Sequence, residues 1–369
     1  MTIRKALPLL WRYLALVAVS CTLAFVISRE GRAAPAPSTA GLAVPTANPV
    51  PTVEADYAAT GRYAIAIRDD VWRDEARQRG VPIRVISPAV ADVESGTKLP
   101  AIIFSHGLGG SKNAGKMWGE HWASHGYIVV HLQHPGSDES IWKRQPTDQV
   151  EGSLKRAMTI SNLGLRVGDV HFVLDEIVRR AQLGTGEFKL ANSKKIGMSG
   201  HSFGAQTTLA IAGHATPGVG GQSGFDKRIS AALAFSPNAR NKNRLDKQFG
   251  DIRMPVLSIT GTKDGAVLND GTKYEDRTLP YKHMPAGDKY LLVLNDADHM
   301  VFGGLNTARR RSATPRDAEI QSDVKAVTLA FWDAYLKGDA PAKGWLAPGK
   351  PDKNGIQNVL AANDRYDAK

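Results

Sequence analysis

The sequence predicts an α/β fold with a mainly parallel, doubly wound sheet flanked by helices. Short apolar runs that suit buried strands recur along the chain and alternate with longer segments that suit helices, which is the pattern of such folds. Residues 195–213 contain a strand, a Gly-x-Ser-x-Gly turn and a helix in immediate succession. Hydrophobic residues make up 42% of the chain, which is enough for a large core and excludes wholesale disorder.

The expected elements follow one another in a regular order. Residues 63–68 and 81–88 alternate apolar and polar side chains, as half-buried strands do, and a charged segment at 70–80 connects them. Further strands, several of them apolar enough to be buried on both faces, are expected at 99–105, 127–132, 195–199, 229–235, 254–260 and 290–294. Helices are expected at about 118–125, 163–181, 204–213 and 318–336.

The first residues differ from the rest of the chain. Three basic residues precede an apolar run at 13–28, and small residues follow it, which is typical of an export signal. We expect residues 1–34 to be a signal peptide or a membrane anchor, and cleavage is favoured because the run is short for a stable span. This predicts a periplasmic or extracellular protein, or one anchored in the inner membrane if the segment is retained.

The remaining domain boundaries follow from composition. The Ala- and Pro-rich residues 35–55 are expected to form a linker, 56–345 the α/β domain, and 346–369 a C-terminal tail. Removal of residues 1–34 takes away five basic residues and one acidic one and so lowers the net charge from +11 to +7. This charge suits anionic surfaces or substrates, but a solvated basic face is the preferred interpretation. No run of interleaved arginines and aromatic residues indicates nucleic-acid binding. Cys21 is the only cysteine, so the cleaved protein would have neither a disulfide nor a thiol nucleophile.

Gly200-x-Ser202-x-Gly204 is the nucleophile-elbow pattern, in which a serine lies on a sharp turn between a strand and a helix. Both glycines are needed, because the strand and the helix approach so closely that side chains at these positions would clash. The motif is short and also arises by chance, so an ordinary Gly-Ser loop is the alternative. The surrounding strand, turn and helix favour the elbow.

Three residues suited to catalysis follow predicted strands in the order Ser, Asp, His. Ser202 follows the elbow strand, Asp264 follows the strand at 254–260, and His299 follows the last strand. Ligands bind beyond the carboxyl ends of parallel strands, which meet at one edge of the sheet. A serine hydroxyl needs a histidine to accept its proton, and the histidine needs a carboxylate to fix its tautomer. We therefore predict a catalytic triad of these three residues.

Each member of the triad has an alternative. Asp264 precedes Gly265 and suits a simple turn, and His299 suits a core histidine. Asp296 and Asp298 are rivals for the acid, but they lie too close in sequence to His299 to approach its far ring nitrogen easily. The strand before that of Asp264 ends without an acidic residue, so Asp264 ranks first.

The oxyanion formed during acyl transfer needs two backbone N–H donors. Phe203, the residue after the predicted nucleophile, is expected to supply one. The glycine-rich loop 106–110 is expected to supply the other, with Leu108 as the first choice. A simple glycine turn is the alternative interpretation of this loop.

The residues that carry a resemblance to a known family are 72–85, 105–110, 200–206 and 298–302. They resemble the platelet-activating-factor acetylhydrolase-like and dienelactone-hydrolase-like branch of the α/β hydrolases, over about residues 60–340. The resemblance implies an α/β-hydrolase fold and a serine esterase without metal or organic cofactor, with Leu108 and Phe203 lining the oxyanion hole. The dienelactone enzymes use a cysteine where Ser202 stands, and the acetylhydrolases of animal plasma carry their acid one strand earlier than Asp264.

Two insertions, 137–161 and 265–288, are expected to shape the substrate pocket. The candidate substrate-binding residues are His201, Trp142 and Met300. The aromatic and sulfur side chains of the insertions suit either an apolar acyl site or a surface loop: Trp142, Tyr274, Tyr281 and Met284. Neither insertion resembles a lid helix with a continuous apolar face, which favours a short-chain esterase over an interfacial lipase.

The leading hypothesis is an exported serine hydrolase that cleaves a small-molecule or lipid-like carboxylic ester. Short-chain acyl esters, acetylated phospholipids and polyesters are the candidate substrates. The N-terminal segment, if retained, adds contact with a membrane. The alternatives are a non-catalytic envelope protein that uses a hydrolase fold for binding, and a serine peptidase, which would normally bring a propeller domain for which the chain has no room.

Overall fold

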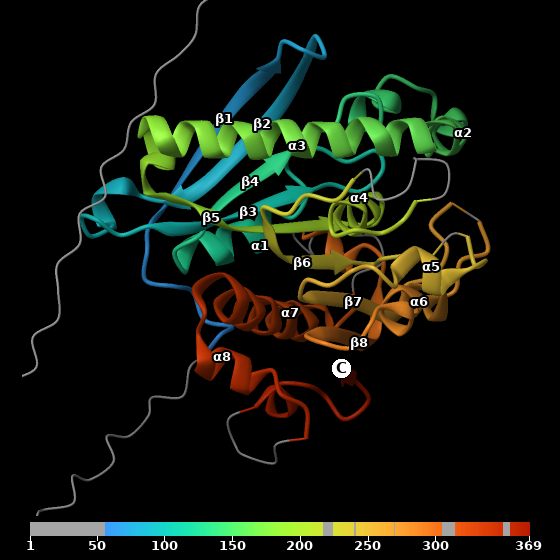
Figure 1. Ribbon diagram of the computed structural model, residues 1–369. Coiled ribbons are helices and arrows are strands. Elements are labelled where there is room, and N and C mark those ends of the chain that lie inside the picture. The colour runs from blue at the N-terminus through green and yellow to red at the C-terminus, as the bar shows by residue number, and fades with distance from the viewer. Residues whose placement is uncertain (1–55, 217–223, 240, 269, 305–313, 350–354) are drawn as a thin grey trace, which may run out of the picture. The chain divides into compact units, whose positions relative to one another are not determined.

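A mixed sheet lies at the centre of the structure, a computed structural model of the chain (Figure 1). The structure describes residues 56–216, 224–239, 241–268, 270–304, 314–349 and 355–369. The strands are β1 (Ile65–Asp74), β2 (Arg79–Pro88), β3 (Leu99–Ser105), β4 (Ile128–Leu132), β5 (Ala191–His201), β6 (Ile229–Phe235), β7 (Val256–Lys263), β8 (Lys289–Asp298) and β9 (Arg365–Ala368). The helices are α1 (Lys116–Ser124), α2 (Thr147–Ala157), α3 (Ile160–Leu183), α4 (Phe203–Ile211), α5 (Leu245–Phe249), α6 (Tyr274–His283), α7 (Asp317–Trp332) and α8 (Ala340–Trp345).

The sheet is mainly parallel. In the described part of the chain its order is β1-β2-β4-β3-β5-β6-β7-β8-β9. The strands from β3 to β8 pair parallel with their neighbours, whereas β1, β2 and β9 add antiparallel edges. The predicted α/β-hydrolase fold, a mainly parallel doubly wound sheet flanked by helices, is confirmed.

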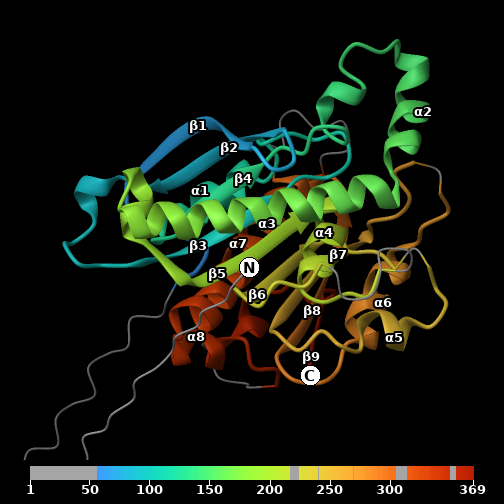
Figure 2. The same ribbon diagram turned by 45° about the horizontal axis from the view of Figure 1, so that its top comes forward.

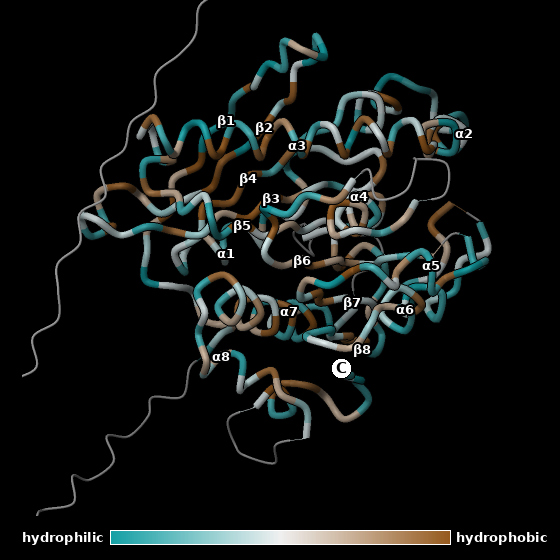
Figure 3. Tube along the Cα trace, in the orientation of Figure 1, coloured by the Kyte–Doolittle hydropathy of each residue, from teal (hydrophilic) through white to brown (hydrophobic). Residues whose placement is uncertain are grey.

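Helices cover both faces of the sheet (Figure 2). One apolar cluster joins α3 and the end of α4 to the strands and includes Val173 and Ile177. The other joins α1 and α7 to the opposite face and includes Trp118, Trp122 and Trp332. The strands between them are strongly hydrophobic, as the colouring of β2 and β4 shows (Figure 3). Burial on both faces explains the apolar runs in the sequence.

The hairpin of β1 and β2 is longer than the sequence predicts. The segment 70–80, expected as a charged connection, continues both strands and pairs Trp72 with Val81 and Asp74 with Arg79. Because β1 is an edge strand, its outward positions tolerate charge, while Trp72 and Asp74 face inward and are buried. Because these edge positions are charged, the sequence pattern did not indicate that the strands continue through residues 70–80.

Residues 365–368, expected as part of a C-terminal tail, form β9 and pair with β8. Four residues of mixed polarity give too weak a periodicity to indicate a strand. The sequence also gave no prediction for α2, α5, α6 and α8, which are short or polar. The sheet thus includes residues beyond the expected domain boundary at 345.

The expected signal peptide or anchor at 1–34 and the linker at 35–55 lie outside the described residues. Among the described residues, no helix combines the length and the apolar character needed to cross a membrane.

Candidate active site

Ser202 lies on a strained turn between β5 and α4. Its backbone has φ 58° and ψ −114°, a conformation that non-glycine residues rarely adopt. A Cβ on Gly204 would overlap Ser105 O, and a Cβ on Gly200 would overlap Gly204 O. The two glycines therefore permit the close approach of strand and helix that places the serine on this turn.

His299 and Asp264 are direct hydrogen-bond partners. His299 Nδ1 lies 2.7 Å from Asp264 Oδ1, so the ring donates from Nδ1 and its Nε2 is left to accept a proton. Asp264 directly follows β7 and His299 directly follows β8, and these two parallel strands are neighbours in the sheet. The topology thus brings together two residues that lie 35 positions apart.

The carboxylate of Asp264 is held on both oxygens in a fully buried position. Its Oδ1 also pairs with Arg277 Nε at 2.7 Å, and its Oδ2 accepts a hydrogen bond of 2.8 Å from Thr260 Oγ1. Burial raises the pKa of Asp264, but His299 and Arg277 together outweigh burial and leave that pKa below its ordinary value. The carboxylate is therefore ionised at neutral pH and able to stabilise a histidine cation.

Ser202 and His299 line the same cavity, which has a volume of about 320 Å³. Leu108 and Phe203, the predicted oxyanion donors, line it as well. Both predicted insertions contribute apolar walls: Trp142, Leu154, Met158, Val267 and Leu268. The candidate nucleophile, base and oxyanion donors thus meet in one mostly apolar space, as expected of a ligand site.

The backbone N–H groups of Leu108 and Phe203 are available to an oxyanion. Phe203 is the first residue of α4, where backbone N–H groups have no partner within the helix. In the described part of the chain, the N–H of Leu108 donates to no backbone carbonyl. The positive end of the α4 dipole adds to the attraction for negative charge.

Arg166 of α3 supports the loop 106–110 from inside the protein. Its side chain is fully buried; Nη1 donates to His106 O at 2.6 Å, and Nη2 donates to Gly107 O at 3.3 Å. Its guanidinium carbon lies 4.5 Å from the ring centroid of Phe203. One arginine therefore contacts both segments that carry the candidate oxyanion donors.

Trp142 supports the same loop from the insertion 137–161. Its Nε1 donates to Gly109 O at 2.7 Å, and Gly109 N donates to Ser137 O at 2.9 Å. The ring also lines the cavity. The loop that carries Leu108 is thus held on both sides, which fixes its N–H before a substrate arrives.

A second Ser, His and Asp group lies next to this loop. Ser105 Oγ is 2.9 Å from His134 Nε2, and His134 Nδ1 is 3.0 Å from Asp169 Oδ2. Arg79 Nε donates to Asp169 Oδ1 at 2.7 Å. Burial and the charge of Arg166 lower the pKa of His134 to about 4, so its ring is neutral at pH 7. Ser105, His134 and Asp169 are 0% exposed, which makes this group structural.

The predicted substrate-binding residues His201, Trp142 and Met300 all line the cavity. His201 Nε2 lies 2.9 Å from His299 O. Burial and the neighbouring His299 lower the pKa of His201 to about 3, so the neutral ring donates to that carbonyl. His201 therefore positions the backbone of His299 in addition to bordering the cavity.

The candidate aromatic wall is only partly present. The residues that line the cavity include Trp142 but not Tyr274, Tyr281 or Met284. Tyr281 packs on Leu291 and Val293 of β8, and Met284 joins a buried cluster with Phe249. These residues belong to α6 and its end, which turn their apolar side chains toward the protein core.

The rival acids have other partners. Asp298 Oδ1 accepts hydrogen bonds of 2.9 Å from the N–H groups of Met300 and Val301 and so caps the turn after β8. Asp296 Oδ1 pairs with Lys263 Nζ at 2.9 Å. The geometry therefore favours Asp264 as the partner of His299.

Several residues of the site escaped the sequence analysis. Arg277 pairs with Asp264 and lines the cavity. Gln206 and Asn238 also line the cavity, and the sequence predicts no role for them. Arg277 lies on α6 inside an insertion, and Asn238 lies in the loop after β6, so no motif marks either residue. Gln206 lies on α4 just after the elbow motif, which assigns a role to the serine and not to this glutamine. Within the described residues, no group of three or more His, Cys, Asp or Glu side chains is placed to hold a metal ion.

Residues 83–160 match the family model described as "Platelet-activating factor acetylhydrolase, isoform II". The chain resembles these α/β-hydrolase-like serine esterases. The matched segment begins within β2, contains the loop 106–110, and ends at the start of α3, before Ser202. No curated protein matches the chain. The similarity points to a hydrolase that acts on esters.

Proposed function

We propose that the protein is a serine carboxylic-ester hydrolase that forms an acyl-enzyme on Ser202. The main support is the convergence of three features on one cavity: a serine on a strained elbow, a histidine oriented by a buried carboxylate, and two free backbone N–H groups. Acyl transfer needs these parts together. The similarity to platelet-activating factor acetylhydrolases is consistent with the proposal.

In the acylation step, Ser202 Oγ attacks the ester carbonyl carbon while His299 Nε2 takes the serine proton. The carbonyl oxygen becomes an oxyanion, and the N–H groups of Leu108 and Phe203 stabilise it. Asp264 stabilises the positive charge on His299. The tetrahedral intermediate then collapses, the alcohol leaves with the proton from His299, and the acyl group stays on Ser202.

In the deacylation step, a water molecule takes the place of the alcohol. His299 accepts one of its protons while the water oxygen attacks the acyl carbon. A second tetrahedral intermediate collapses, Ser202 Oγ regains a proton from His299, and the carboxylic acid leaves. The arrangement needs only the residues of the chain and water.

The apolar walls support uncharged or lipid-like esters as substrates. Short-chain acyl esters, acetylated phospholipids and polyesters all fit this class. We further propose that the N-terminal segment directs export of the protein, and that a retained segment would anchor it to the inner membrane. Mass measurement of the N-terminus of the secreted or membrane-extracted protein distinguishes cleavage from retention.

Hydrolysis of p-nitrophenyl acetate tests the proposed activity. We expect turnover by the wild-type protein and a loss of about 10⁵-fold or more in Ser202→Ala, as for removal of a triad serine. Ser230→Ala is the matched control, because Ser230 lies at the amino end of β6, away from the edge that carries the triad. Equal turnover in Ser202→Ala and wild type would end the proposal.

A further inference from the structure

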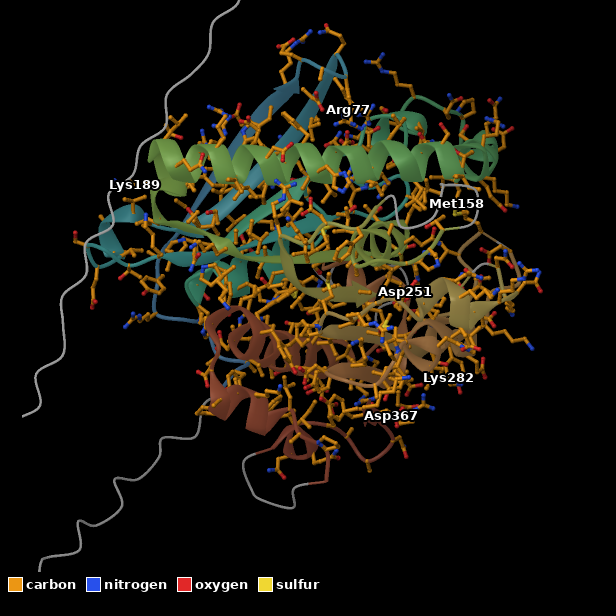
Figure 4. All side chains as sticks on the ribbon, in the orientation of Figure 1. Arg77, Met158, Lys189, Asp251, Lys282 and Asp367 are labelled. Carbon is orange, nitrogen blue, oxygen red and sulfur yellow. The ribbon has the colours of Figure 1, made fainter. Side chains whose placement is uncertain are left out.

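A second cavity, with a volume of about 220 Å³, adjoins the first. The two cavities share four lining residues: Met158, Phe203, Gln206 and Asn238. Met158 lies in the connection between α2 and α3 (Figure 4). The second cavity therefore begins beside the candidate oxyanion hole, on the far side of these four residues from Ser202.

The wall of the second cavity is largely apolar. Leu163 of α3, Leu209 of α4, Ala239 after β6 and Phe249 of α5 line it, and each is buried. Ile160, at the start of α3, also lines it and is 53% exposed. Apolar walls favour an apolar occupant over water.

Polar groups that line this cavity bind one another. His214 Nδ1 lies 3.1 Å from Thr216 Oγ1, and His214 Nε2 lies 3.3 Å from Gln248 Oε1. Gln248 Nε2 donates to Asn241 O at 2.9 Å. Burial lowers the pKa of His214 to about 4, so its ring is neutral at pH 7. These groups require no charged or polar atoms from a ligand.

The position of His299 determines which part of an ester reaches the second cavity. The oxygen of the leaving alcohol must face His299, which returns its proton. His299, Met300 and Gly303 line the first cavity and do not line the second. The second cavity instead borders Phe203, whose N–H is a candidate donor to the carbonyl oxygen. The acyl side of the ester therefore points away from His299 and toward the second cavity.

We propose that the second cavity binds the acyl chain of the substrate, and that the preferred substrates are esters of unbranched, medium-length fatty acids. This inference rests on the proposed function. An engineered protein cavity of about 150 Å³ holds a benzene molecule, so a cavity of this larger size accommodates a chain of about eight carbons. The inference replaces the short-chain acyl group expected from the sequence with a medium-length apolar chain.

The test measures kcat/KM for p-nitrophenyl esters from acetate to palmitate. We expect the wild-type protein to prefer octanoate over acetate by about tenfold or more, because each buried methylene adds binding energy. Leu163→Trp fills the cavity and is expected to remove most of this preference, because kcat/KM for octanoate falls much more than kcat/KM for acetate. Leu163→Ala enlarges the cavity and is expected to move the optimum to longer chains.

Leu183→Trp is the matched control, because Leu183 lies at the other end of α3 and is 62% exposed. Its octanoate-to-acetate ratio should equal that of wild type. Circular dichroism checks folding. If Leu163→Trp does not fold, the shift in chain-length optimum of Leu163→Ala tests the inference by itself. A ratio unchanged in both Leu163 variants would overturn the acyl-chain inference.

A wild-type optimum at acetate would overturn the inference as well. In both cases, acetate hydrolysis that depends on Ser202 leaves the proposed esterase function standing. A wild-type protein that hydrolyses none of the esters would overturn the function and the inference together.

Discussion

Two regions of the molecule contain the same four residue types and share the contacts among the histidine, the aspartate and the arginine. The first, called the open group, comprises Ser202, His299, Asp264 and Arg277. The second, called the buried group, comprises Ser105, His134, Asp169 and Arg79. In both, a histidine Nδ1 donates to an aspartate that an arginine also binds. Within the described residues, the His–Asp–Arg contacts alone do not distinguish the two groups, but a Ser–His hydrogen bond is present in the buried group, between Ser105 Oγ and His134 Nε2 at 2.9 Å, and not between Ser202 and His299.

The difference lies in the serine and its surroundings. Ser202 has a positive φ at the start of a helix and lines a cavity, whereas Ser105 ends a strand and is 0% exposed. The hydroxyl of Ser105 already contacts His134 Nε2 and, at 3.4 Å, Arg166 Nη1. The comparison teaches that a Ser, His and Asp group requires access to substrate and free N–H donors before it suits catalysis.

Removal of each serine should give the largest contrast between the groups. Ser202→Ala is expected to lower kcat by about 10⁵-fold or more without a change in stability, because it removes the proposed nucleophile. Ser105→Ala is expected to lower the free energy of unfolding by about 1–3 kcal/mol, because a buried histidine nitrogen loses its partner. Steady-state hydrolysis and urea unfolding of both variants test the contrast, and a larger loss of kcat in Ser105→Ala would reverse it.

The second largest contrast is expected between Asp264, whose replacement should lower kcat, and Asp169, whose replacement should lower stability. Asp264→Asn is expected to lower kcat by about 10⁴-fold, as in triad proteases, because the amide favours the wrong tautomer of His299. Asp169→Asn is expected to destabilise the protein by about 3–5 kcal/mol, because Arg79 loses a buried charge partner. Asp296→Asn serves as the control for the first variant. A larger loss of kcat in this control would show that Asp264 is not the triad acid.

Arg166 lies between the groups and connects them. Arg166→Met is expected to lower kcat by about 10–100-fold with little change in KM, because the loop that carries Leu108 loses the support that places its N–H. Arg180→Met is the control, since Arg180 lies on the same helix but contacts Trp72 and Glu176. If KM rises and kcat stays constant, Arg166 acts on substrate binding and not on the position of the loop.

The smallest expected effect is a dependence of stability on pH. The pKa of His134 is lowered to about 4 in the folded protein, whereas an unfolded histidine has a pKa of about 6.5. Between these values the unfolded chain takes up a proton that the folded chain does not bind, so the free energy of unfolding falls as pH falls. Urea midpoints should decline from pH 7 to 4.5, and less steeply in His134→Gln. Equal slopes in the two proteins would contradict a buried neutral His134.

The fold class and the positions of the candidate triad could be predicted because local and topological signals agree there. Gly200 and Gly204 are required by close backbone contacts, so the motif records a physical constraint. Asp264 and His299 follow adjacent parallel strands, and chain order alone places both at the same sheet edge.

The supporting residues could not be predicted, because their contacts arise only after distant segments pack. Arg277 reaches Asp264 from α6 inside an insertion, and Arg166 reaches the loop 106–110 from α3. His134 and Asp169 pair across 35 residues without any motif. The same limit applies to β9, whose four residues form a strand only because the edge of β8 is free to pair with them.

Labelling with a fluorophosphonate most directly tests the claim that the open group alone is a catalytic centre. An activated serine Oγ displaces fluoride from the phosphorus of this probe, and peptide mass spectrometry identifies the modified residue. We predict one label, on Ser202, that is lost in Ser202→Ala and retained in Ser105→Ala. A label on Ser105, or a wild-type protein that hydrolyses esters without labelling at Ser202, would contradict the account.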